Sequence, residues 1–245
     1  MSTPVPPSGA AGGEDVVGGG PAPAAGPAPG GRRLALALLT LTFTTGLVDA
    51  ATYLGLGQVF TGFQTGNIVL LGFAFAGTEG FSVAASSASL GSFFVGAAVG
   101  GRLAGRLSAR HRGWFGMSLA MEAMLMALAA AVAVGLSPAA LTDRRFAVIA
   151  LLGLAMGLRN ASVRRLAVAD LTTTVLTSTV TGLAAESRLV RSDRARQARR
   201  VAAIGAMLLG AVTGALLVRV SLVLPFVVVA GIIALTGAVY RTTVR

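Results

Sequence analysis

The chain has 245 residues, of which 54% are hydrophobic and 12% are charged, and its formal net charge is +11. Soluble domains carry about 25% charged residues, so this composition excludes an ordinary soluble domain and indicates an all-α polytopic membrane protein. Because the chain contains no cysteine, it cannot form disulfides or thiolate metal sites.

The first 33 residues differ from the rest of the chain in composition. They are dominated by Pro, Gly and Ala, as in the stretch GAAGGEDVVGGGPAPAAGPAPGG. Such a segment has little apolar surface to bury, so residues 1–33 are predicted to be a disordered cytoplasmic tail. The remainder, 34–245, is expected to form a single membrane domain.

Apolar segments follow one another along this domain, and the arginines between them indicate how many segments cross the membrane. The segments are 34–56, 60–77, 83–106, 114–135, 145–163, 171–187, 201–219 and 221–240. Eight crossings would place arginine clusters on both sides. If 60–77 and 171–187 are re-entrant or broken half-helices, nearly all clusters become cytoplasmic, as the positive-inside rule expects. We therefore predict six spans with both termini in the cytoplasm, and keep eight short spans as the alternative.

The two exceptional segments occupy equivalent places in two similar stretches of about 110 residues. GLVDAATYLGLGQVFTGFQTGNIVLLG, from Gly46, aligns with GLRNASVRRLAVADLTTTVLTSTVTG, from Gly157, and Asp49 then falls on Asn160. The six-span topology turns the second stretch upside down. We therefore predict two inverted repeats, about 34–135 and 145–240, an arrangement common in transporters.

These same stretches, with the Gly-rich LGSFFVGAAVGGRLAGRL, resemble the YoaK family of uncharacterised bacterial integral membrane proteins. The resemblance covers residues 34 to 240. Its more specific motifs are Thr-Gly-Asn at 65–67 and DLTTT at 170–174. It implies a membrane location, a multi-span fold and no assigned activity.

Asp49, Glu122 and Arg159 lie inside predicted spans, where charge is costly and commonly functional. Asp49 is interpreted as a proton carrier or cation ligand, or as a structural partner of Arg159 or of a backbone N–H. Glu122 is expected to point into the bundle, most simply in an interhelical hydrogen bond. For Arg159 the favoured interpretation is a side chain that reaches the membrane interface; the alternative is an ion pair with Asp49 or an anionic substrate.

The polar residues of the two motifs are the predicted solute-binding groups. Threonines 174, 177 and 181 share one helical face, and Asp170 is predicted to cap the helix that carries them. The predicted binding set is Asp49, Gln64, Thr65, Gly66, Asn67, Asn160, Thr174, Thr177 and Thr181.

The residue content of the chain favours transport over catalysis. They contain no catalytic set, no phosphate loop and no metal-ligand cluster, so we expect neither an enzyme nor a bound cofactor. We also expect no nucleic-acid partner, because the arginines follow the loop pattern. The sequence predicts a small-solute transporter or channel in the bacterial cytoplasmic membrane, its partners being the lipid bilayer and an unknown small solute. The alternative is a membrane scaffold or sensor that forms a homo-oligomer through its Gly-rich faces.

Overall fold

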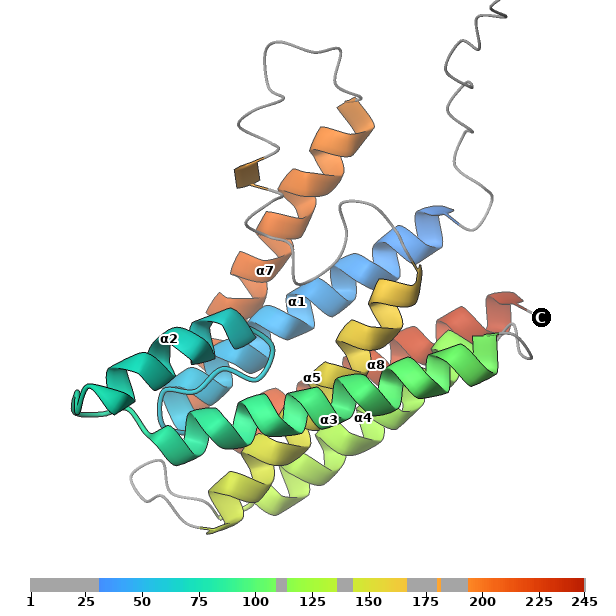
Figure 1. Cartoon of the computed structure of the whole chain (residues 1–245). Coiled ribbons are helices and arrows are strands. Elements are labelled where there is room, and N and C mark those ends of the chain that lie inside the picture. The colour runs from blue at the N-terminus through green and yellow to red at the C-terminus, as the bar shows by residue number, and fades with distance from the viewer. Residues whose placement is uncertain (1–30, 109–113, 136–142, 167–179, 182–193, 245) are drawn as a thin grey trace, which may run out of the picture.

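A computed structural model describes residues 31–108, 114–135, 143–166, 180–181 and 194–244, and this part of the chain contains helices and no strands. Its helices are α1 (Gly31–Gly55), α2 (Gln64–Phe75), α3 (Val83–Ser108), α4 (Trp114–Ala133), α5 (Asp143–Leu166), α7 (Arg194–Val220) and α8 (Val223–Val244) (Figure 1). The all-helical class predicted from composition is confirmed.

Six of these helices are long and apolar enough to cross a membrane: α1, α3, α4, α5, α7 and α8. The exception is α2, whose 12 residues span about 18 Å, well short of a hydrocarbon core of about 30 Å. The described helices therefore support six spans. Helix α1 begins at Gly31, three residues before the predicted start, so the last residues assigned to the tail belong to its first turn. Residues 1–30, and most of 171–187, lie outside the described residues.

Two pairs of helices cross closely through glycines. On α3, a Cβ at Gly96 or Gly100 would collide with the carbonyls of Leu154 and Leu158 on α5. Because both contacting residues advance together along their helices, α3 and α5 run in the same direction. Close approach of this kind is the usual role of small residues spaced four apart in membrane helices.

The second glycine crossing joins α7 to α1. A Cβ at Gly210 would collide with the carbonyl of Phe43, and one at Gly214 with the carbonyl of Leu47. Helices α1 and α7 are therefore also parallel. These contacts explain why glycine, which weakens an isolated helix, is kept at these positions.

The remaining pairs are antiparallel. Helix α4 contacts α8 through Gly116 against Arg241 and through Leu119 against Gly237, so the numbering rises on one helix as it falls on the other. Two residues alone separate α7 from α8, which places these neighbours in opposite directions. Helix α4 also packs along α5, and of the described helices α3 is the one against which α2 packs (Figure 1).

Candidate functional site

Asp49 joins the C-terminal third of α1 to a segment that comes later in the chain. It lies six residues before the end of α1, or about 9 Å along the helix, and is 4% exposed. Its Oδ1 accepts hydrogen bonds from the backbone N–H groups of Thr61 at 3.0 Å and Gly62 at 2.7 Å. Residues 61 and 62 therefore lie beside the interior of α1, at the depth of Asp49.

The chain returns to this depth through a sharp reversal after α1. Gly57 and Gln58 have positive φ angles of 88° and 57°, and the N–H of Gln58 donates to the carbonyl of Tyr53 at 3.0 Å. A left-handed glycine with this back-bond is a common helix ending. The segment that follows enters the protein before α2 begins at Gln64.

Asn67 holds the returning segment in place. Its Oδ1 accepts from the N–H of Phe60 at 2.9 Å, and its Nδ2 donates to the carbonyl of Phe60 at 2.6 Å and to Oε1 of Gln64 at 2.8 Å. Ser89 of α3 also donates to the Phe60 carbonyl, at 2.6 Å. Asn67 is completely buried, and its side chain satisfies both backbone polar groups of the partly buried Phe60 from within the protein.

Gly62 and Gly66 allow close contacts. A Cβ at Gly62 would lie 2.7 Å from Cε of Met156 and 3.1 Å from Oδ2 of Asp49. A Cβ at Gly66 would lie 2.9 Å from the ring of Phe60 and would collide with Phe63. Gly62, Gly66 and Asn67 are thus explained by the need to hold irregular backbone inside a membrane protein. Thr65, by contrast, is exposed.

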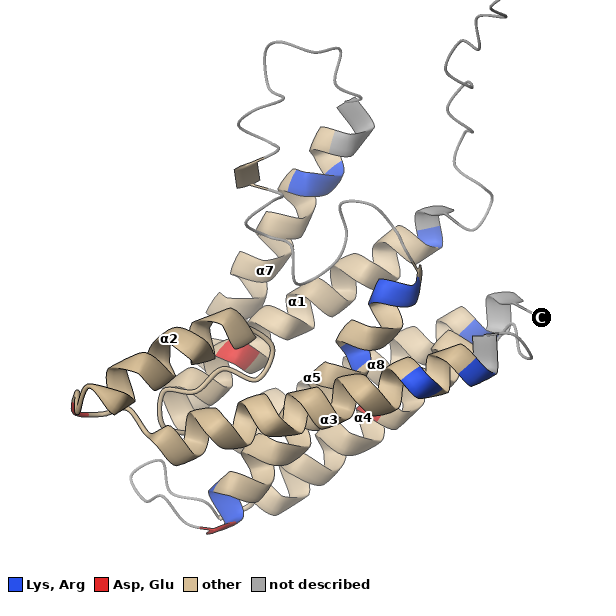
Figure 2. Ribbon diagram, viewed as in Figure 1, with Lys and Arg blue, Asp and Glu red and all other residues tan. Residues whose placement is uncertain are grey.

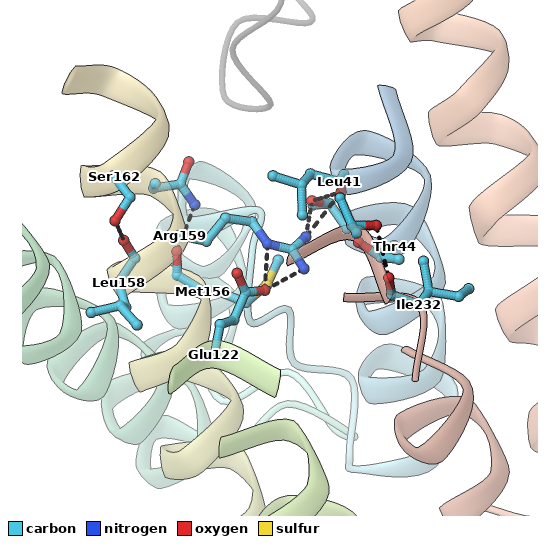
Figure 3. A network of polar contacts seen from close by, with 11 residues as sticks. Leu41, Thr44, Glu122, Met156, Leu158, Arg159, Ser162 and Ile232 are labelled. Carbon is cyan, nitrogen blue, oxygen red and sulfur yellow. Dashed lines mark hydrogen bonds and ion pairs between the residues drawn. The ribbon is translucent and has the colours of Figure 1, made fainter. Parts of the chain in front are cut away.

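Arg159 and Glu122 form the other polar centre of the bundle (Figure 3). The Arg159 Nε donates to Oε1 of Glu122 at 2.6 Å, and Nη2 completes the ion pair with the same oxygen. Nη1 donates to the carbonyl of Leu41 at 2.9 Å and to Oγ1 of Thr45 at 2.8 Å. The expectation that Arg159 reaches the membrane interface is wrong: the residue is 2% exposed, and the carboxylate with which it pairs belongs to Glu122.

The two polar centres are neighbours on α1. Thr45, which accepts from Arg159, lies one helical turn before Asp49, and its methyl group lies 3.0 Å from the Cβ position of Gly62. Oδ2 of Asp49 has no hydrogen-bond partner. Both carboxylates are buried: Glu122 is paired with the Arg159 guanidinium, whereas Oδ2 of Asp49 is buried without a hydrogen-bond partner.

A cavity of about 440 Å³ adjoins Asp49. It lies between α1, the segment before α2, and α7. Its lining residues are Gly46, Asp49, Ala50, Tyr53, Leu54, Phe60, Phe63, Met207, Ala211, Val212 and Ala215. Asp49 is the one charged residue in this lining.

The structure brings together part of the predicted binding set. Asp49, Gln64, Gly66 and Asn67 lie around the returning segment, whereas Asn160, on α5, donates to the carbonyl of Met156 at 2.8 Å. Thr181 is exposed. Asp170, Thr174 and Thr177 lie outside the described residues.

Sequence reasoning missed Ser89 and Thr45. Ser89 sits in the small-residue run VAASSASLGS and Thr45 in the pair TT, and neither is distinguished there from its neighbours. Their roles depend on the residues that the fold brings against them. A serine or threonine in a span commonly bonds its own helix, and Thr45 does donate to the carbonyl of Leu41 at 2.8 Å.

The chain was compared with known proteins. A stretch of 159 residues, 62% of the chain, is 33% identical to the UPF0700 transmembrane protein YoaK of Bacillus subtilis (strain 168), and the match covers 65% of that protein's length. No solved structure matches the chain. The model of the family described as "Protein of unknown function (DUF1275)" matches residues 37–239. The chain therefore belongs to the DUF1275 family and is a multi-pass, YoaK-like membrane protein.

Proposed function

We propose that this protein is a small-solute transporter of the bacterial cytoplasmic membrane, with Asp49 at the centre of its site. The observation that carries the proposal is the state of this carboxylate: its Oδ1 accepts from two backbone N–H groups, its Oδ2 is buried without a hydrogen-bond partner, and Asp49 is the one charged residue in the lining of a cavity. An incompletely paired carboxylate in a span is costly, and such residues commonly mark ion and proton pathways. Asp49 binds a proton or a cationic group in turn.

The directions of the helices support a re-entrant first motif. Helix α4 is antiparallel to both α5 and α8, and α7 reverses into α8. Because α1 is parallel to α7, and α3 to α5, α1 and α3 must run in opposite directions. A connection that crossed the membrane would leave them parallel. The segment from 56 to 82, with α2, thus enters and leaves at one membrane face.

The glycine contacts support the inverted repeat. Shifting by 111 positions moves Phe43 onto Leu154 and Leu47 onto Leu158; shifting by 114 moves Gly96 onto Gly210 and Gly100 onto Gly214. The contacts of Gly96 and Gly100 on α5 then correspond one for one to those of Gly210 and Gly214 on α1. The first span of each repeat, α1 or α5, thus packs against the third segment of the other repeat, α7 or α3. A pseudo-twofold axis between the repeats requires this exchange.

The two repeats differ in charge at the site. The repeat alignment places Asn160 opposite Asp49, so one half carries a carboxylate where the other carries an amide. A neutral amide cannot release a proton, so proton coupling to transport is assigned to the repeat that carries Asp49. The proposal also includes a second re-entrant motif with Asp170, Thr174 and Thr177. This part of the proposal rests on the sequence alone.

The alternative, a scaffold that oligomerises through its glycines, loses part of its basis. Gly96, Gly100, Gly210 and Gly214 pack against helices of the same chain. On α3, Gly101 meets open space, next to the packed Gly100. Packing within the chain accounts for the packed glycines, so an interface between copies is not needed to explain them.

An uptake panel tests the proposal. Cells that express the full chain, and matched cells that express Asp49→Asn, are supplied with radiolabelled inorganic cations, amines, amino acids and sugars. We expect at least one solute to accumulate or be depleted with the native chain and not with the variant. If both chains behave like the empty vector across the panel, while present in the membrane in equal amounts, the transporter proposal is rejected.

A further inference from the structure

The lining of the cavity indicates the kind of solute that it accepts. A volume of about 440 Å³ is in the range of sites for drug-sized molecules, which commonly combine an apolar surface with a few polar groups. Apart from Asp49 and Tyr53, the lining consists of glycine, alanine, aliphatic, methionine and phenylalanine side chains. A strongly hydrated solute would lose its water here without receiving replacement hydrogen bonds.

Three aromatic rings gather in the same wall. Tyr53 and Phe60 stack with their ring centroids 4.9 Å apart, and Phe63 meets Phe60 edge-on at 5.4 Å. All three residues line the cavity. Aromatic faces attract organic cations within about 6 Å, and groups of rings are a common means of binding quaternary ammonium compounds.

The charge of the site has one sign. Asp49 is the one charged residue in the lining, and its Oδ2 is buried without a hydrogen-bond partner, so a solute pairs with this oxygen when the side chain turns toward the cavity. The nearest buried cation described, Arg159, is paired with Glu122 and is absent from the lining. An anion would be repelled from this cavity, and a neutral apolar molecule would leave the carboxylate without a partner.

The mouth of the cavity faces sideways from the bundle. Leu54, Phe63 and Val212 line it and are 56%, 51% and 49% exposed. Leu54 lies next to the end of one candidate span and Val212 lies inside another, so the opening extends from the membrane interface into the hydrocarbon region. A solute that dissolves in the bilayer can reach it without first crossing a water-filled vestibule.

We propose that the solute of this site is a lipophilic organic cation, an amine or quaternary onium with a largely apolar body, held by Asp49 and the Tyr53–Phe60–Phe63 ring cluster. The inference rests on the proposed function, because it names the solute class for the same site. Exchange needs no chemical step: Asp49 holds either the organic cation or a proton.

Equilibrium binding to the full chain in lipid nanodiscs tests this inference. The probe is radiolabelled tetraphenylphosphonium, with triphenylphosphine oxide as the neutral competitor of similar shape and empty nanodiscs as background. We expect saturable binding that the neutral compound displaces at least about tenfold less well than unlabelled probe. Asp49→Asn should weaken binding by at least about tenfold, the loss expected when a charged partner is removed.

A second variant keeps the test independent of Asp49. Ala211→Phe fills the cavity from α7 and should abolish binding, whereas Leu208→Phe, on the same helix but 63% exposed and outside the lining, should bind like the native chain. Native binding by both Asp49→Asn and Ala211→Phe, in variants that elute as folded particles, would overturn the inference. So would equal displacement by the neutral compound, which would mark the cavity as an acyl-chain groove.

The outcomes separate the two proposals. Specific binding of the cation without transport of any solute would support the site and reject the transporter. Transport of another solute by a chain that does not bind the probe would reject the lipophilic-cation assignment and leave the transporter proposal standing.

Discussion

Glu122 of α4 and Arg159 of α5 form an ion pair in the interior of the bundle, 37 residues apart in the chain and with side chains 1% and 0% exposed. The guanidinium also reaches Leu41 and Thr45 of α1, so the pair joins three helices. Ser118 and Ser162, one turn away, hydrogen-bond across the same α4–α5 contact. This polar chain lies next to the turn of α1 that carries Asp49.

Breaking the ion pair should destabilise the fold. Glu122→Gln leaves a buried, uncompensated arginine, and removal of one partner of such a pair costs about 3–5 kcal/mol. We expect a clearly lower midpoint of thermal unfolding for Glu122→Gln in nanodiscs. The double variant Glu122→Leu with Arg159→Met should recover most of the loss, because it removes both charges. Equal stability of the native chain and Glu122→Gln would show that the pair has no structural role.

The glycines of α3 should differ sharply in their tolerance of alanine. Gly96→Ala would drive a methyl group into the Leu154 carbonyl and force α3 away from α5, whereas Gly101 faces open space. Gly96→Ala should lower the unfolding midpoint. Gly101→Ala should leave it unchanged or raise it, because alanine is about 1 kcal/mol more favourable than glycine inside a helix. Similar midpoints for both variants would contradict the close α3–α5 crossing.

Asn67 should be required for the order of the returning segment. Asn67→Ala removes both bonds that Asn67 makes to the Phe60 backbone; the carbonyl keeps its bond from Ser89, but the partly buried N–H loses its side-chain partner, at a cost of up to about 1–3 kcal/mol for an orphaned group. Hydrogen exchange should become faster over residues 59–64. Thr65→Ala, an exposed neighbour in the same motif, serves as the control and should exchange like the native chain. Unchanged exchange in Asn67→Ala would show that Asn67 does not hold the segment.

The direction of each helix predicts which ends face the cytoplasm. Arginines occur in the last turns of α3, α5 and α8, which end on one side, and Figure 2 shows basic residues gathered there at the ends of α3 and α8. The positive-inside rule predicts that this side is cytoplasmic. The native chain has no cysteine, so each of Glu79→Cys, Ser221→Cys and Thr243→Cys carries a single thiol. An impermeant maleimide added to intact cells should label positions 79 and 221 and spare 243. The opposite pattern would invert the topology.

Much of the fold could be predicted from the sequence, because span length and apolar content are local properties. The predicted segment 83–106 corresponds to α3 and 114–135 to α4, with differences of two residues. Asp49 and Asn67 could be identified because a carboxylate or amide inside an apolar run is costly wherever it points. Their partners could not be identified, since the bonds from Asp49 to Thr61 and from Asn67 to Phe60 depend on the chain reversing after α1.

Arg159 shows why local reasoning failed elsewhere. The residue lies seven positions before the end of α5, close enough to the two arginines at that end to suggest an interfacial side chain. Its place in the interior is set by Glu122, which comes from another helix and compensates its charge. A pairing between distant spans leaves no periodic signal in either segment.

Solute-coupled proton movement in proteoliposomes tests the central claim most directly. The full chain is reconstituted with a pH-sensitive dye in the lumen, and the solute identified by the uptake panel is added outside. The account predicts that the native chain changes the luminal pH as solute enters. Asp49→Asn should reduce this response by at least about tenfold, and Asp49→Glu should retain part of it. A response of native size from a correctly folded Asp49→Asn would contradict the account, because proton coupling would not then pass through Asp49.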